Sequence, residues 1–548
     1  MHFDLDGAGL SELQAEICIV GAGAAGITAA RRLLAAGHEV MLLESGGLDY
    51  EPDTSDLNAG ENVGEPYYDL DHARLRFFGG TTAIWGGRIA QFDPIDLRRR
   101  SWVPHSGWPI SYRDLLAYQE YALAEFDLKA RLPSLKALGA AGVRVPDFDP
   151  GRLESRLWVF DGKFNRFTFA SCRDLRDHPR CTIVTHATVT NVRTDEMARE
   201  VTSLVVSSRA RRTVTIKARA FLLAAGGIEN PRILLASRST MPMGLGNAHN
   251  LVGRFFMEHP HARGGRIVTA KTWDLLNAYG RSHMLGRDRV AALIAASERH
   301  QEQAAMLNSS VTIVPRQAAD ASQMWGMRVY NRVKHDMAPT RAGRALWMHT
   351  KRTVTWLQRK LDPLRPWLLH KAGSVELALL IRAEQAPNPN SRITLSPERD
   401  ALGMPRVRLD WRLSDLDIHS VERLVAALGA EFDRLGLGRV EPAAWVSAPE
   451  RRWRTDNLIS AHPFGGYHHM GTTRMADDPR HGVTDGFGRV FGLDNLYVAG
   501  SSLFPTSGWA NPTLTIVALA LRTADHISQR LAGQGAPAAE TPVRVAAS

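Results

Sequence analysis

Three glycines near the start of the chain have the spacing of a phosphate-binding turn. Gly21, Gly23 and Gly26 directly follow a short apolar segment. The first glycine permits a tight turn, the second lets a pyrophosphate approach the backbone, and the third allows a helix to pack closely on a strand. This spacing indicates the binding of a dinucleotide, and both NAD and FAD satisfy it.

The segments around these glycines predict the βαβ unit that would position them. Residues 16–20 are expected to form a buried strand, residues 27–36 a helix that ends at Gly37, and residues 39–43 a second strand. Glu44 follows the second strand, where a carboxylate can accept hydrogen bonds from ribose hydroxyls. The N–H groups at the start of the helix would bind the phosphates.

Later segments repeat the strand-and-turn pattern far from the first unit. Residues 219–227 and residues 495–501 each predict a strand that runs into a glycine turn, and residues 511–527 predict a long apolar helix. A cofactor that is contacted by both ends of the chain must be long, which favours FAD over NAD. A remote substrate loop would produce the same pattern.

Composition narrows the class of protein. The chain has 548 residues, of which 44% are hydrophobic and 23% are charged, and this excludes collagen-like, coiled-coil and wholly disordered proteins. Cys18, Cys172 and Cys181 lack the spacing of a disulfide framework or a zinc site. No secretory signal is evident, and apolar runs such as residues 514–521 are too short to span a membrane. We therefore expect a cytoplasmic protein.

Most of the net charge of +10 lies in one segment, residues 327–371, where eleven Lys and Arg residues face two Asp residues. Its apolar residues have helical spacing, which predicts a basic amphipathic helix that also carries tryptophans. Such a helix can dock on an anionic membrane or on a protein partner. The more common alternative is a surface helix that packs on the core. No nucleic-acid-binding motif accompanies the charge.

Several motifs in one order resemble the glucose–methanol–choline (GMC) oxidoreductase family. Beside the glycine fingerprint, these motifs are Gly79–Arg88, Tyr467–Thr472, Val498–Pro505 and Ala510–Ile516. The resemblance extends from Ile17 to about Gln529. It implies an α/β fold in which discontinuous segments form a Rossmann-like FAD-binding domain and a sheet-based α+β domain binds the substrate. It also implies alcohol oxidation by hydride transfer to flavin N5.

The resemblance suggests how these domains divide the chain. We expect the FAD-binding domain in residues 1–95, 180–260 and 455–535, and the substrate-binding domain in residues 96–179 and 261–454. Residues 536–548 are rich in Ala and are expected to form a disordered tail.

The resemblance also implies two catalytic residues. The family's catalytic base is the His of a Tyr-His-x-x-Gly motif, which falls on His468, and an ordinary histidine pKa of about 6.5 suits that role. The side chain of His469 should point elsewhere, because neighbouring side chains alternate in an extended segment. The second catalytic position falls on Asn511, whose amide can hold a substrate oxygen. Asn511 is also a favourable residue for starting a helix.

For FAD, the resemblance implies contacts from the glycine fingerprint, from Glu44 and from a set of later residues. These are Gly80, Thr81, Trp85, Gly86, Gly87, Val189, Ala225, Gly500, Ser501, Asn511, Pro512 and Thr513. The position at which some family members attach FAD covalently through a His is Ile84, so FAD should bind non-covalently. No metal site is expected: Glu258, His259 and His261 lack a third well-spaced partner, and the family uses no metal.

Some details resemble one branch of the family, the pyranose oxidases and sugar dehydrogenases. They are Trp85 and the segments 253–261 and 384–392. This branch implies oxidation of a secondary hydroxyl of a sugar, glycoside or polyol, and Glu384 and Gln385 are candidates to contact such a substrate. Two alternatives remain: oxidation of a hydroxyl on a lipid or natural-product scaffold, and a flavin-bearing subunit of an electron-transfer complex.

The sequence does not distinguish between possible electron acceptors. Oxygen, a quinone and a redox protein are all compatible with the sequence, so the enzyme is expected to be a dehydrogenase or an oxidase. If the acceptor is a membrane quinone or a redox protein, residues 327–371 are the candidate docking surface.

Overall fold

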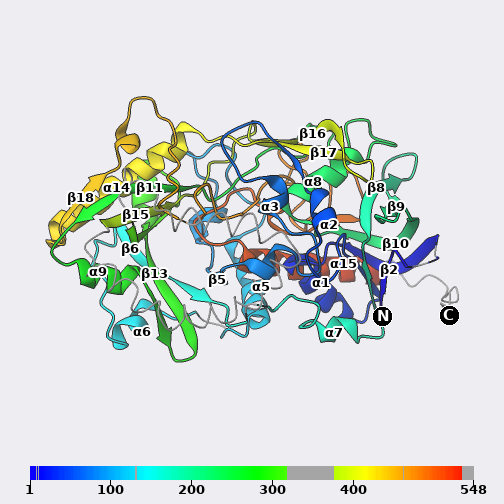
Figure 1. The fold of residues 1–548 in the computed structure, drawn as a ribbon, viewed down its shortest axis with the longest axis horizontal. Coiled ribbons are helices and arrows are strands. Elements are labelled where there is room, and N and C mark those ends of the chain that lie inside the picture. The colour runs from blue at the N-terminus through cyan, green and yellow to red at the C-terminus, as the bar shows by residue number, and fades with distance from the viewer. Residues whose placement is uncertain are drawn as a thin grey trace.

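The chain is described here by a computed structural model. Its described residues are all except 8, 10, 130–131, 164, 317–375, 461 and 534–548. The basic segment 327–371 and the tail 536–548 therefore lie outside the described residues, and the structures expected for them stay predictions. The molecule is elongated, and its two larger sheets lie toward opposite ends of the long axis (Figure 1).

The first sheet is mostly parallel and contains the predicted βαβ unit. In spatial order its strands are β1 (His2–Asp4), β7 (Cys181–Thr185), β3 (Val40–Leu43), β2 (Glu12–Val20), β10 (Thr213–Leu223), β9 (Val201–Ser207) and β8 (Thr188–Thr194), with β19 (Leu496–Val498) also paired to β10. The apolar end of β2 is buried between β3 and β10, as expected for a central parallel strand. The predicted strands at residues 16–20 and 39–43 are confirmed.

Helices cover this sheet. They are α1 (Ala24–Ala35), α5 (Tyr112–Glu125), α7 (Arg173–Arg176), α8 (Gly226–Ala236) and α15 (Thr513–Gly533). Helix α1 ends at Gly37, as predicted, where a φ of +92° suits glycine. It begins three residues earlier than predicted, because the last glycine of the fingerprint is already helical. Helix α15 packs on both α1 and α5 and is longer than predicted.

The second sheet is antiparallel. In spatial order its strands are β18 (Arg439–Pro442), β11 (His261–Val268), β15 (Glu376–Arg382), β14 (Ser310–Arg316), β13 (Asp288–Ala296), β6 (Leu153–Phe160) and β5 (Arg88–Ile89), with β12 (Ser282–Leu285) paired to β13. One face is apolar and packs against α14 (Asp415–Leu435) and α9 (Thr272–Tyr279). Antiparallel sheets commonly bury one face in this way and leave the other polar.

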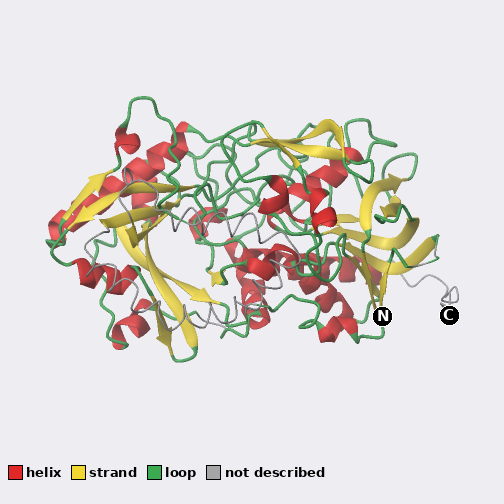
Figure 2. Cartoon of the chain, in the orientation of Figure 1, coloured by secondary structure: helices red, strands yellow, loops and turns green. Residues whose placement is uncertain are grey.

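A small third sheet and short helices complete the fold. The sheet contains β16 (Arg392–Arg399), β17 (Pro405–Asp410) and β4 (Gly60–Asn62). The short elements are α2 (Pro52–Asp56), α3 (Leu70–Ala73), η1 (Gly80–Ile84), α4 (Pro94–Leu97), α6 (Leu135–Ala140), α10 (Glu298–Ala304), η3 (Ala444–Ser447) and η4 (Ser501–Leu503). Figure 2 shows that loops make up much of the chain between the two large sheets.

Two elements pack across the domain boundaries that the sequence suggested. Strand β5 lies within residues 1–95 but pairs with β6 of the second sheet. Helix α5 lies within residues 96–179 but packs on α15, over the first sheet. The chain crosses from the first sheet to the second sheet before residue 95, because β5 already pairs with β6. A domain boundary placed at residue 95 of the sequence therefore does not coincide with the boundary between the two packed units. Among the described helices, none is both long enough and apolar enough to cross a membrane.

Candidate active site

The three glycines between β2 and α1 each have the local geometry that the sequence predicted. Gly21 has a φ of +105°, which favours glycine. A Cβ on Gly26 would lie 1.9 Å from the Gly21 carbonyl oxygen, so only glycine allows this close packing. A Cβ on Gly23 would meet nothing within 4 Å. The turn is therefore tight and closely packed on one side and open on the other, where a pyrophosphate would lie.

Glu44 lies at the end of β3, beside this turn. Its carboxylate accepts hydrogen bonds from the Ala22 N–H at 3.1 Å and the Gly46 N–H at 2.9 Å. Burial raises the pKa of Glu44, although these N–H groups oppose that shift. Val189 is also near, since the neighbouring Thr188 hydroxyl lies 2.5 Å from the Ser45 hydroxyl. A ribose hydroxyl at this position would find a carboxylate that is already held in place.

Two further turns open at the same edge of the first sheet. Strands β10 and β19 pair with each other, and Gly226 and Gly500 follow them. Each has a positive φ and open space where a Cβ would lie. Ligands of open α/β sheets bind outside the carboxyl ends of the strands. The edge is thus a continuous cradle for a long dinucleotide, and Ala225 and Ser501 lie beside these glycines.

The segment that resembles the family's flavin loop lies against this cradle. The Gly79 N–H donates to the Ala22 carbonyl oxygen at 2.7 Å, and Gly80 and Thr81 start η1 directly after it. The Trp85 indole N–H is buried and has no hydrogen-bond partner among the described residues. Gly86 and Gly87 follow it, before β5. An open backbone cradle beside an unsatisfied donor fits the flavin end of FAD.

His468 and Asn511 meet at the start of α15. The Asn511 Nδ2 atom lies 3.3 Å from His468 Nε2. Asn511 and Pro512 precede α15, which begins at Thr513, so the amide lies at the amino-terminal end of a long helix. The neighbouring His469 points to a different partner, as predicted: its Nε2 atom lies 2.9 Å from the Tyr67 hydroxyl.

A second histidine, His259, contacts the other ring nitrogen of His468. The two Nδ1 atoms lie 2.8 Å apart, and His259 Nε2 lies 3.2 Å from the Ser507 carbonyl oxygen. A carbonyl oxygen only accepts, so His259 Nε2 carries its proton and the neutral ring leaves Nδ1 as an acceptor. His468 must then donate from Nδ1. This arrangement leaves His468 Nε2 unprotonated, facing Asn511.

Glu258 holds the loop that carries His468. Its carboxylate accepts from the His468 N–H at 2.9 Å, the His259 N–H at 2.7 Å and the Gly466 N–H at 3.1 Å. The Tyr67 hydroxyl also donates to it, at 2.6 Å. The Glu258 side chain is fully buried. Glu258, which the sequence did not predict to bind a metal, thus positions the histidine loop through hydrogen bonds.

Electrostatics keep these histidines neutral. Burial, followed by the charges of neighbouring histidines and of Arg382, lowers the pKa of His468 well below its ordinary value. Burial lowers the pKa of His259 to about 4 and that of His469 to about 3. Burial raises the pKa of Glu258 to about 7, against its four donors. A neutral His468 is able to accept a proton at physiological pH.

The structure places Glu384 and Gln385 away from an open site. Both side chains are fully buried. Glu384 forms an ion pair with Arg100 and also accepts from the Asn308 N–H. Gln385 accepts from the Trp411 indole and from the Glu258 N–H, and its amide donates to a backbone carbonyl. Their hydrogen-bonding atoms are taken by the protein, so the geometry does not support the substrate contact that the sequence suggested.

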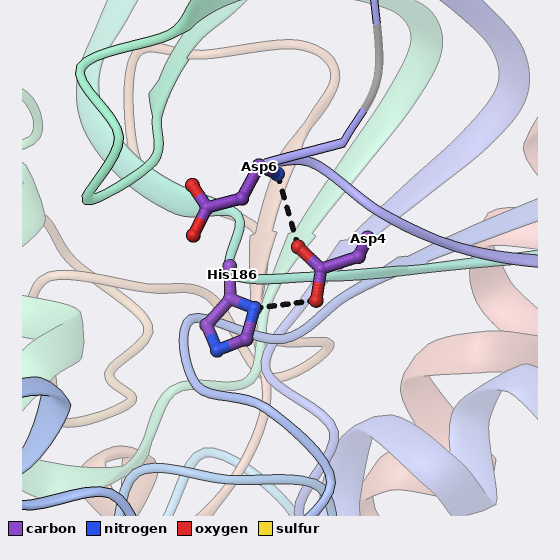
Figure 3. Close-up of side chains that lie close together, drawn as sticks. All are labelled: Asp4, Asp6 and His186. Atoms are coloured by element: carbon purple, nitrogen blue, oxygen red, sulfur yellow. Dashed lines mark hydrogen bonds and ion pairs between the residues drawn. The ribbon is translucent and has the colours of Figure 1, made fainter.

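One group of carboxylates and histidine in the described part of the chain is close enough to share a metal ion, and it lies at the same carboxyl edge of the first sheet, after the outer strands β1 and β7. Figure 3 shows Asp4, Asp6 and His186. His186 Nδ1 lies 2.6 Å from Asp4, and its Nε2 lies 2.8 Å from Glu51. Burial opposes protonation of His186, but these carboxylates raise its pKa overall. The group joins the amino-terminal strand to β7 as an ion-pair network.

Comparisons with known proteins identify the class. A family model described as FAD dependent oxidoreductase matches residues 16–339, and one described as GMC oxidoreductase matches residues 387–520. The solved structure of pyridoxine 4-oxidase from Mesorbium loti has a TM-score of 0.57 and 16% identity, covering 94% of this chain and 99% of that chain. The fold is that of a flavoprotein oxidoreductase with a discontinuous FAD-binding domain.

Two curated relatives align over nearly their whole length. The 2-methyl-1,2-propanediol dehydrogenase of Mycolicibacterium austroafricanum is 24% identical, covering 94% of this chain and 96% of the relative. The 6'''-hydroxyparomomycin C oxidase of Streptomyces lividus is 26% identical, covering 95% of this chain and 92% of the relative. The chain belongs to the GMC oxidoreductase family. It is an enzyme that uses FAD to oxidise CH–OH groups.

Proposed function

We propose that the enzyme oxidises a secondary hydroxyl of a sugar, glycoside or other polyol, with His468 as the base and Asn511 as the group that holds the hydroxyl oxygen. The observation that carries this proposal is the unprotonated His468 Nε2, which faces the Asn511 amide beside the glycine cradle. The diol dehydrogenase and the aminoglycoside oxidase among its relatives support a polyhydroxylated substrate.

The residues of the site divide the reaction between them. Bound FAD, held non-covalently, would supply the acceptor for the hydride from the carbinol carbon. The substrate hydroxyl donates to His468 Nε2, while the Asn511 amide donates to the same hydroxyl oxygen. The proton moves onto His468 Nε2, and the ring continues to donate from Nδ1 to His259. Glu258 keeps the histidine loop in place through its backbone contacts.

The electron acceptor is proposed only as one of three chemical classes. Oxygen, a quinone or a redox protein would reoxidise the enzyme, and residues 327–371 stay the proposed docking surface for a membrane quinone or redox protein. Deletion of that segment should impair turnover with the natural acceptor and leave reduction by substrate intact. Equal loss of both would remove the segment from this role.

Cys18, Cys172 and Cys181 are free and buried, which supports a reducing compartment such as the cytoplasm.

The test is an anaerobic titration of the purified enzyme with sugars, glycosides and simple alcohols, followed by its visible spectrum. Bleaching of the flavin bands by a sugar-like compound, and not by simple alcohols, is the expected result. Admission of air then separates an oxidase from a dehydrogenase. A flavin spectrum that no polyol bleaches would overturn the substrate class and favour a lipid or natural-product hydroxyl.

A further inference from the structure

The second sheet presents a cationic and aromatic face on the side opposite its apolar core. Side chains alternate between the two faces of a strand. Val159 of β6 is buried in the apolar core with α14, so its neighbours Trp158 and Phe160 face the other way. The register places Arg88 of β5 opposite Phe160, and Arg382 of β15 opposite His261 of β11.

Two arginines of this face flank one tryptophan. The guanidinium carbon of Arg88 lies 5.4 Å from the centre of the Trp158 ring, and that of Arg382 lies 5.0 Å from it. Arg382 also donates to the Thr312 hydroxyl at 2.7 Å. Contacts between guanidinium groups and aromatic faces are favourable, but they do not neutralise the charges. Arg289 of β13, over the Phe160 ring, adds a further positive charge.

The donors in this cluster lack acceptors. In the part of the chain that the structure describes, Arg88 Nε and Trp158 Nε1 are buried without a hydrogen-bond partner, and neither Arg88 nor Arg382 forms an ion pair. Burial, followed by the charge of Arg289, lowers the pKa of Arg88 to about 10. Burial, followed by Arg88 and Arg316, lowers the pKa of Arg382. Uncompensated buried cations are costly, so proteins usually pair them.

Two nearby arginines, Arg100 and Arg156, are paired with carboxylates. Arg100 Nη1 donates to Glu384 at 2.8 Å, and both side chains are almost fully buried. Arg156 of β6 forms an ion pair with Asp93. Glu384 and Asp93 are therefore already engaged with other arginines. The difference indicates that the described residues do not supply the counter-charge of Arg88 and Arg382, and a bound anion would supply it.

The cluster lies next to the catalytic residues. Arg382 pairs across the sheet with His261, and its charge is one of those that lower the pKa of His468. The Trp158 ring lies 6.1 Å from that of Trp509, two residues before Asn511. The FAD pyrophosphate does not explain the cluster, because its cradle lies at Gly23, on the first sheet.

We propose that the alcohol substrate carries an anionic group, a carboxylate or a phosphate, which binds to Arg88, Arg382 and the Trp158 indole N–H while its hydroxyl group binds to His468 and Asn511. The proposal rests on the proposed function. Arginine guanidinium groups bind both kinds of anion through paired hydrogen bonds. The hydroxyl groups of a neutral polyol can accept hydrogen bonds from the orphan donors, but they would leave both positive charges without a counter-charge.

The test compares three sugars that differ only at C6: glucose, glucuronate and glucose 6-phosphate. Their binding to the FAD-loaded enzyme is measured by calorimetry, and their reduction of the flavin by anaerobic stopped flow. At least one anionic sugar should bind about tenfold or more tightly than glucose, with an affinity that falls as salt rises. The preferred anion distinguishes a carboxylate substrate from a phosphate substrate.

Variants then assign the preference to the two arginines. The double variant Arg88→Gln/Arg382→Gln should lose the preference for the anion, while its affinity for glucose changes by less than about threefold. Arg382→Lys should keep part of it, because the charge remains. Arg266→Gln is the matched control: Arg266 is on β11, exposed, and paired with Glu441. It should behave as the wild type.

The unfolding temperature distinguishes a ligand-binding role of Arg88 and Arg382 from a structural role. Without ligand, the double variant should unfold at the same temperature as the wild type or at a higher one, because it removes unpaired charges. Arg100→Gln should unfold at a lower temperature, because it leaves the buried Glu384 carboxylate unpaired. Equal binding of the three sugars would overturn the proposal. A double variant that unfolds at a lower temperature than the wild type, and that loses affinity for glucose as much as for the anionic sugars, would also overturn it.

The two proposals fail in different ways. Arginine-dependent binding of an anionic sugar that does not reduce the flavin would leave the anion site standing and contradict the proposed function for this substrate class. Reduction by glucose, glucuronate and glucose 6-phosphate with equal efficiency would support the proposed function and contradict the anion site.

Discussion

The carboxyl edge of the first sheet and the polar face of the second sheet contribute to one reaction by different means. The edge binds through its backbone: turns at Gly23, Gly226 and Gly500 leave open space, and N–H groups line it. The face acts through side chains such as His261 and Arg382, beside the histidine loop. A backbone site cannot tolerate added side-chain atoms, whereas a side-chain site can change its chemistry without losing the cofactor. Substitutions on the two sides should therefore have separable effects.

The largest effect is expected from His468→Ala. Removal of the base should lower the rate constant of flavin reduction by about 100- to 10,000-fold, with FAD still bound, because the base contributes to the transition state and not to cofactor binding. Anaerobic stopped flow measures the rate constant, and the visible spectrum measures the FAD content. His469→Gln is the control, since His469 contacts Tyr67 instead. Unchanged reduction in His468→Ala would remove it from the mechanism.

A pair of glycine variants tests the backbone side. Gly23→Ala should fold with normal stability but bind FAD roughly 5- to 150-fold more weakly, because its Cβ fills the open space that the pyrophosphate needs. Gly26→Ala should instead lower the unfolding temperature, because its Cβ would lie 1.9 Å from the Gly21 carbonyl oxygen. Titration of the apoprotein with FAD, with thermal unfolding, distinguishes the two. Normal FAD affinity in Gly23→Ala would contradict the cradle.

A smaller effect is expected at His259, which acts through His468. His259→Phe removes the acceptor for His468 Nδ1–H and should slow flavin reduction about five- to tenfold, with little change in substrate affinity. His259→Gln supplies an amide oxygen and should restore part of the rate. A purely structural role for His259 would instead lower the unfolding temperature equally in both variants, without rescue of the rate.

The smallest effect is expected from pH. Burial, the neighbouring histidines and Arg382 hold the pKa of His468 well below its ordinary value, so the ring stays neutral as pH falls through the usual histidine range. The rate constant of flavin reduction should change by less than about twofold between about pH 6 and 8. Ionisation of Glu258, with a pKa of about 7, would make any change an increase with pH. A fall of more than about twofold from about pH 8 to about pH 6 would contradict this expectation.

The sequence alone determined the nucleotide-binding unit and the family. The βαβ segments, the end of α1 at Gly37 and the class of cofactor follow from local patterns, because turn geometry and helix capping depend on residues close in the chain. The motif around His468 also marked a candidate base. The opposite directions of His468 and His469 followed from the alternation of an extended segment.

Only the tertiary structure decided what surrounds these residues. The tautomer of His468 depends on His259, more than two hundred residues earlier in the chain, and on the Ser507 carbonyl oxygen. Glu384 has the chemistry of a substrate ligand, but its ion pair with Arg100 occupies its carboxylate. Arg88 and Arg382 carry no sequence signal as a pair. Their meeting at Trp158 depends on the register of β5, β6 and β15, and pairing between distant strands is set by packing rather than by local sequence.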